Sequence, residues 1–123
     1  MKNNEYSYSH PYTVWETISS QLLKDIAMDV LKAGERVPSI NELAKQYNVS
    51  ANTAAKALEF LRDEDVIMKK RGIGFFVLPF AKQKVKQLLE DDIDQKIDNI
   101  LNEAKNLGYK KEEILKHITE IWG

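Results

Sequence analysis

The stretch SINELAKQYNVSANTAAKALEFL, residues 39–61, constrains the fold of this chain more than any other part of it. Ser39 followed by Glu42 has the spacing of a capping box, which predicts the start of a helix. Asn48 stands where a turn is needed, because Asn is one of the few non-glycine residues that tolerate a left-handed backbone. Ser50 can then cap a further helix. The stretch therefore predicts two short helices joined by a tight turn.

The apolar positions of this stretch are typical of a helix-turn-helix. Leu43 and Ala44 before the turn, and Val49 and Ala54 after it, have the spacing of that motif, with small residues where the helices cross. The second helix should run to about Glu64. An ordinary helical hairpin has some of the same features, so these residues alone leave that alternative open.

Two β-prone runs follow in VIMKKRGIGFFVL, residues 66–78, on either side of a turn that holds Gly72 and Gly74. This arrangement indicates a β-hairpin. The glycines do not form a nucleotide-binding loop, since no helix follows them to receive a phosphate. A hairpin directly after the two helices favours the helix-turn-helix interpretation.

A further helix is expected upstream, where Thr13 and Glu16 repeat the capping-box spacing. Apolar residues then recur every three or four positions, and Gly34 provides a stop. This stripe consists of Trp15, Ile18, Leu22, Ile26 and Val30. The fold class is therefore mainly α with a small β-hairpin wing. We expect a winged helix-turn-helix over residues 11–80, preceded by a flexible arm at 1–10.

Residues 81–123 have a different pattern. Apolar residues recur at intervals of three and four along a long helix that Gly108 ends, and a shorter helix follows. Two such helices cannot bury both apolar stripes against each other, so the remaining surface favours a second copy of the chain. We predict a helical dimerisation tail whose contact is made by Leu89, Ile93, Ile97, Ile100, Leu107, Ile118 and Trp122.

The composition excludes several classes of site. The chain has no cysteine, which rules out disulfides, thiolate zinc sites and cysteine nucleophiles. Its histidines are His10 and His117, and the acidic run EDDID at 90–94 lacks the spacing of a calcium loop. We therefore expect no enzyme, no metal site and no cofactor.

Hydropathy gives no sign of a membrane protein. There is no apolar run of about 18 residues, the length that a spanning helix needs. The first residues, MKNNEYSYSH, are too polar for a signal peptide. We expect a soluble protein of the cytoplasm.

The charge distribution matters more than the total. The net charge of −1 at first argues against a nucleic-acid partner, but no acidic residue occurs from Val66 to Leu89. That window contains Lys69, Lys70, Arg71, Lys82, Lys84 and Lys86. A chain that is neutral overall can thus present one basic edge to phosphates.

The helix after the turn has two distinct faces. At about 100° per residue, Ala54, Leu58 and Leu61 point to the core. The opposite face carries Ala51, Asn52, Ala55, Lys56 and Glu59. Alanine methyl groups in a major groove can contact thymine methyl groups and allow a close approach of the backbone.

The polar residues of this face keep several alternatives open. Asn52 can pair with an adenine edge, bond a phosphate or face solvent. Ser50 and Thr53 suit phosphate binding at the helix N-terminus or serve as caps only. Lys56 is a phosphate or guanine contact or a solvated charge. The basic hairpin tip can lie along a minor groove or backbone, or simply face solvent.

The candidate residues lie at the starts of the two helices, on the outer face of the second helix and at the tip of the hairpin. We expect DNA contacts from Ser39, Asn41, Ser50, Ala51, Asn52, Thr53, Ala55, Lys56, Lys69, Lys70, Arg71 and Gly72.

The run AGERVPSINELAKQYNVSANTAAKALEFLRDEDVIMKKRGIGFFV resembles the N-terminal domain of the GntR family of bacterial transcription regulators, over roughly residues 11–78. The tail, with LNEAKNLGYKKEEILKHI, resembles the YtrA-like branch, since it is too short for an effector-binding domain. The resemblance implies a homodimer whose tail is the dimerisation unit, often a repressor of a transporter operon.

The chain departs from the family pattern at specific positions. Asn41 and Ala51 stand where the family usually has Arg, Asp65 where it has Gly, and Phe75 where it has Thr. The arginine contacts of the family therefore cannot be transferred to this chain, whereas the fold can.

We therefore expect a sequence-specific, dimeric DNA-binding regulator, most simply a repressor that acts on an inverted-repeat operator. The alternative from another class is a winged-helix adapter that binds proteins rather than specific DNA. A ligand-gated regulator differs from the first hypothesis only in requiring a small-molecule effector, for which the sequence shows no convincing pocket.

Overall fold

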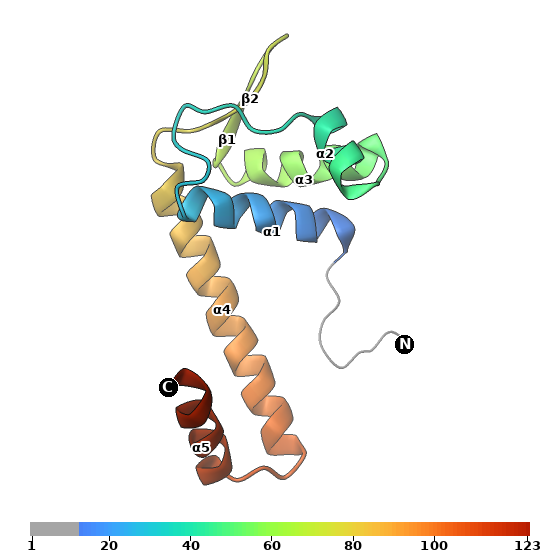
Figure 1. The fold of residues 1–123 in the computed structure, drawn as a ribbon. Coiled ribbons are helices and arrows are strands. Elements are labelled where there is room, and N and C mark those ends of the chain that lie inside the picture. The colour runs from blue at the N-terminus through green and yellow to red at the C-terminus, as the bar shows by residue number, and fades with distance from the viewer. Residues whose placement is uncertain (1–12) are drawn as a thin grey trace. The chain divides into compact units, whose positions relative to one another are not determined.

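The computed structural model describes residues 13–123, so the expected arm at 1–10 lies outside the described residues. Helices and one antiparallel pair of strands follow each other in the predicted order (Figure 1). The elements are α1 (Val14–Ala27), α2 (Ile40–Tyr47), α3 (Ala51–Asp63), β1 (Ile67–Lys70), β2 (Gly74–Val77), α4 (Ala81–Asn106) and α5 (Lys111–Trp122). This is the mainly α winged helix-turn-helix with a two-helix tail that the sequence predicts.

Helix α1 begins as expected and ends earlier than expected. The Thr13 side chain and the Glu16 carboxylate form the capping box. The helix stops at Ala27, and Asp29 adopts a left-handed conformation with φ of 61°. The backbone N–H of Val30 then donates to the Asp25 carbonyl at 2.8 Å, and Val30 is exposed. The expected continuation of the stripe to Val30 is therefore wrong, because the chain turns away from the helix axis before that residue.

The turn between α2 and α3 follows the sequence signals closely. Ser39 and Glu42 cap α2 reciprocally, at 3.1 and 2.8 Å. Asn48 has φ of 54° and ψ of 52°, the left-handed geometry predicted for it. The Ser50 hydroxyl accepts the Thr53 backbone N–H at 3.1 Å and starts α3. Local hydrogen bonds thus define both helix starts.

The β1–β2 hairpin is extended by a third segment that the sequence does not reveal. Ile67 pairs with Val77 and Lys70 with Gly74 across the hairpin. Residues 34–37 lie along the other edge of β2, where the Val37 N–H donates to the Phe75 carbonyl at 2.8 Å. The connection between α1 and α2 is thereby fixed to the wing.

The core lies where α1, α3 and the base of the hairpin meet. Figure 1 shows α1 and α3 side by side, with the hairpin projecting beyond them. Ala54 and Ala57 are completely buried, since small side chains allow the helices to approach closely. The remaining core consists mainly of Ile18, Leu22, Ile26, Val37, Leu43, Leu58, Leu61, Val66, Ile67 and Val77.

Helix α4 takes part in two compact units, one that extends to Gln87 and one from Leu88 to Gly123. Its first turns bury Ala81 and Val85 in the first unit. There the Lys82 ammonium also donates to the Asp29 carboxylate at 2.6 Å. The first unit therefore includes the beginning of the segment that we expected to form the tail.

The second unit leaves most of its large apolar side chains exposed. Gly108 follows the end of α4 with φ of 91°, and the Lys110 N–H donates to the Glu113 carboxylate at 2.8 Å at the start of α5. None of the α5 residues, all of which the structure describes, is buried. The predicted dimer residues are half-buried at Leu89 and exposed at Ile93, Ile97, Ile100, Leu107, Ile118 and Trp122. Among the described residues, no helix is long and apolar enough to cross a membrane.

Candidate nucleic-acid interface

The N-terminus of α3 is a capped helix start without nearby acids. The Ser50 hydroxyl lies 2.9 Å from the Thr53 hydroxyl and also accepts the Thr53 N–H. The first turn of α3 carries no acidic residue, whereas α1 and α2 have Glu16 and Glu42 there. Acidic side chains normally offset the partial positive charge of a helix N-terminus. At α3 that charge remains available to an external anion such as a phosphate.

The outer face of α3 presents small and polar groups. Ala51 and Asn52 are exposed, while Thr53 and Ala55 are half-buried. The structure therefore keeps these residues together at the solvent side of the helix start, as the helical spacing predicts. No long side chain projects from Ala51 or Ala55, so a flat polar surface such as a groove floor can approach this face.

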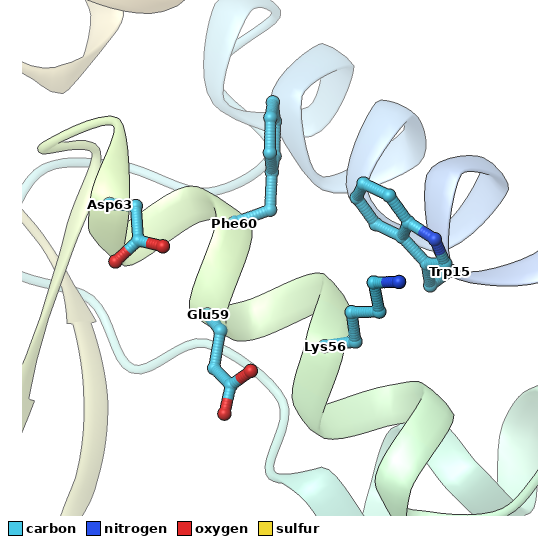
Figure 2. Close-up of a pocket in the computed structure, with 5 residues that line it drawn as sticks. All are labelled: Trp15, Lys56, Glu59, Phe60 and Asp63. Atoms are coloured by element: carbon cyan, nitrogen blue, oxygen red, sulfur yellow. The ribbon is translucent and has the colours of Figure 1, made fainter.

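Lys56 lies on the flank of α3 that faces α1. Its ammonium nitrogen is 5.0 Å from the centre of the Trp15 ring, a cation–π distance. Figure 2 shows Lys56 reaching from α3 toward Trp15, while the Glu59 carboxylate points away from the indole. The Trp15 and Phe60 rings are 5.6 Å apart and tilted by 54°. Sequence reasoning placed Trp15 in the core stripe of α1 and missed this contact.

These residues line an open groove of about 210 Å³. Its walls are Trp15, Lys56, Glu59, Phe60 and Asp63. Two carboxylates and one ammonium make the groove acidic on balance. The groove is therefore unsuited to binding phosphate. The candidate DNA interface on this side ends at Lys56.

The start of α2 supplies the next candidates. Ser39 is half-buried, and its hydroxyl caps the helix, while Asn41 is exposed. The pKa of the Glu42 carboxyl lies below its ordinary value of 4.5, chiefly because the Ser39 backbone N–H donates to it. The Ser39 side chain and the charge of Arg36 lower the pKa further. Glu42 therefore stays ionised and holds the cap.

Arg36 is a basic residue that sequence reasoning missed. Its guanidinium lies 4.0 Å from the Glu42 carboxylate, and a Cβ atom on Gly74 would lie 3.1 Å from its Nε. Arg36 therefore passes directly beside the backbone of β2 and links the wing to the start of α2. The sequence shows a basic residue in the extended segment before Val37. It does not show that this segment pairs with β2, which is what brings Arg36 to the wing.

The wing places its cations in two different settings. The Lys69 ammonium lies 5.9 Å from the Phe75 ring centre and the Lys70 ammonium 4.5 Å from that of Phe76. Arg71 and Gly72 are exposed at the tip, where Gly72 has φ of 77°. Phe75, which is buried in β2, thus also contacts a lysine side chain.

The residues that the structure describes form no group of His, Cys, Asp or Glu that could hold a metal ion.

Comparison with known proteins agrees with this architecture. Residues 15–77 match the family model of bacterial regulatory proteins, gntR family. A probable fructoselysine utilization operon transcriptional repressor of Escherichia coli is 42% identical over 82 residues, which are 67% of this chain and 32% of that protein. The chain thus spans about a third of the length of that relative.

Two other relatives match nearly the whole chain. The transcriptional repressor YtrA of Bacillus subtilis is 27% identical over 108 residues, 88% of this chain and 83% of that protein. The structure of a GntR family transcriptional regulator from Listeria monocytogenes has a TM-score of 0.75 at 25% identity, covering 92% of this chain and 98% of that one. The short two-helix tail therefore occurs in relatives of the same size. The chain belongs to the gntR family of bacterial regulatory proteins and has the architecture of its YtrA-like members.

Proposed function

We propose that this DNA-binding transcription regulator acts as a homodimeric repressor on an inverted-repeat operator. The observation that carries the proposal is the start of α3, a serine-capped helix end with no acid in its first turn and with Ala51 and Asn52 exposed. A helix of this kind can enter a major groove and bring its free N–H groups to a phosphate.

Within this proposal, Asn52 reads the sequence and the groups around it position the helix. An Asn side chain can bond the N6 and N7 edge of adenine. The Ser50 and Thr53 hydroxyls and the α3 N-terminus lie next to it and suit the phosphate backbone. Asn41 on α2 and the basic wing would contact the flanking backbone.

The uncovered apolar face of the second unit supports a homodimer. Ile97, Ile100 and Ile118 are each about half exposed in the single chain. A large number of exposed apolar side chains marks an interaction site, and a second copy offers the same side chains in return. A twofold dimer would present two α3 helices, so the half-sites should be inverted and spaced by about 10 bp or a multiple of it.

Repression is the simplest regulatory outcome, because a dimer on an operator blocks the access of other proteins to that DNA. The E. coli and B. subtilis relatives are both named as repressors. We extend the proposal to a transporter operon and to a cytoplasmic location, in line with the YtrA-like architecture.

Selection of genomic fragments by the immobilised full chain tests this proposal. We expect enrichment of fragments that share an inverted repeat, with an affinity that falls steeply as salt rises because phosphate contacts release counterions. If no fragment is retained even at low salt, the proposal fails and the protein-binding adapter becomes the better interpretation.

A further inference from the structure

Ile73 stands at the tip of the wing with 62% of its surface exposed. Its backbone N–H donates to the Lys70 carbonyl at 2.9 Å, which closes a turn through Arg71 and Gly72. Gly72 has φ of 77° at the third position of this turn, where glycine is favoured. The turn therefore holds a bulky apolar side chain in the three-residue loop, residues 71–73, that closes a basic hairpin.

The lysine side chains of the wing lie away from the tip, where Arg71 and Ile73 are exposed. Lys69 and Lys70 lie over the Phe75 and Phe76 rings, along the sides of the hairpin. No acidic residue occurs from Val66 to Leu89, so nothing in the hairpin neutralises its positive charge. The positive charge of such a tip suits a partner with a negatively charged surface. Its exposed apolar side chain suits a partner with apolar groups beneath that surface.

Duplex DNA has this character, because negatively charged strands enclose stacked bases. We propose, resting on the DNA-binding function above, that Ile73 enters the minor groove and wedges between two base pairs while Arg71 lies in the groove beside it. Isoleucine is one of the side chains that unstack base steps from the minor groove and bend the duplex. Arginine is attracted to a narrow minor groove by its negative potential.

This role gives the wing a part in specificity. Pyrimidine–purine steps unstack more easily than other steps, so a wedge favours sites with such a step beneath it. The exposed or half-exposed face at the start of α3 carries only the short side chains of Ala51, Asn52 and Ala55. The wedge would let the protein distinguish sites by how easily their base steps unstack. The short side chains of α3 contact base edges and cannot make this distinction.

The test uses a fragment recovered by the genomic selection, labelled with fluorophores at both ends so that energy transfer reports the bend. The variants are Ile73→Ser, Ile73→Leu as the conservative replacement, and Met68→Ser as the control. Met68 is 40% exposed on the same hairpin but lies in β1, away from the tip. Both positions are at the surface, so the fold should be unaffected.

We expect the wild-type chain and the Ile73→Leu and Met68→Ser variants to bend the duplex by about 20–90°. Ile73→Ser should leave it close to straight and weaken the preference for a pyrimidine–purine step. A straight duplex with the wild-type chain, or an equal bend with Ile73→Ser, overturns the wedge while leaving DNA binding intact. Failure of the wild-type chain to retain any fragment removes the proposed function itself.

Discussion

The ammonium nitrogen of Lys56 lies 5.0 Å from the centre of the Trp15 ring, across the interface between α3 and α1. Phe60 stands 5.6 Å from the same ring, so one aromatic side chain near the start of α1 contacts two successive turns of α3. The contact joins α3 to α1 beside the surface that we assign to DNA.

A double-mutant cycle measures this contact. Lys56→Met keeps the aliphatic stem and removes the charge, and Trp15→Leu removes the ring. We expect a coupling of about 0.5–1 kcal/mol in the free energy of unfolding, the value of a partly exposed cation–π pair. Urea unfolding of the four proteins gives the coupling, and a value near zero would show that the two groups do not interact in solution.

Ala51→Glu should abolish operator binding without unfolding the protein. A glutamate in the first turn of α3 is compatible with the helix dipole, so circular dichroism and Tm should be maintained. The same carboxylate would face the DNA phosphates and be repelled by them. This repulsion should cost about 2 kcal/mol or more of binding free energy. Ala51→Gln is the neutral control of equal size. Unchanged affinity of the glutamate variant would move the DNA-binding surface away from the start of α3.

Asn52→Ala distinguishes the two contacts open to this side chain. If Asn52 bonds a base, the substitution should cost about 1–3 kcal/mol and relax the preference at one operator position. Binding to a set of single-base operator variants measures this. A uniform loss across all of them would assign Asn52 to a phosphate instead.

Replacing Ile97 and Ile100 with lysine should yield monomers in sedimentation experiments. Both side chains are about half exposed in the single chain, and charge at these positions would oppose burial against a second copy. The matched control is the double change Gln95→Lys and Asn99→Lys, at exposed polar positions of the same helix. An intact dimer in the isoleucine variant would refute the tail as the dimer contact.

The Glu42 cap should make stability depend on pH in the acidic range. The pKa of this carboxyl is lowered in the folded protein, mainly by the Ser39 N–H. Its contribution is therefore present above its ordinary pKa of 4.5 and is lost as pH falls through the lowered folded-state value.

Glu42→Gln tests this expectation, because glutamine retains the capping hydrogen bond but does not titrate. Between neutral and acidic pH, the Tm of the variant should fall less than that of the wild-type chain. Thermal unfolding over a pH series measures the difference. Parallel Tm curves would mean that the cap does not contribute to the pH dependence.

Part of the interface was predictable from the sequence, and part was not. Helical spacing predicted that Ala54, Leu58 and Leu61 are buried while Ala51 and Asn52 are exposed, and the structure confirms it. It also placed Lys56 on the outer face but could not predict its contact with Trp15. Periodicity describes one helix, whereas the partner of a side chain depends on how a second helix lies beside it.

The sequence by itself determined the local features: the capped starts of α1, α2 and α3, the left-handed turn at Asn48 and the hairpin. Each depends on hydrogen bonds or backbone preferences within a few residues. The tertiary structure alone decided that residues 34–37 pair with β2 and that Arg36 lies beside Gly74. These features require segments that are distant in the chain to meet, and their energy comes from packing and pairing that no short stretch encodes.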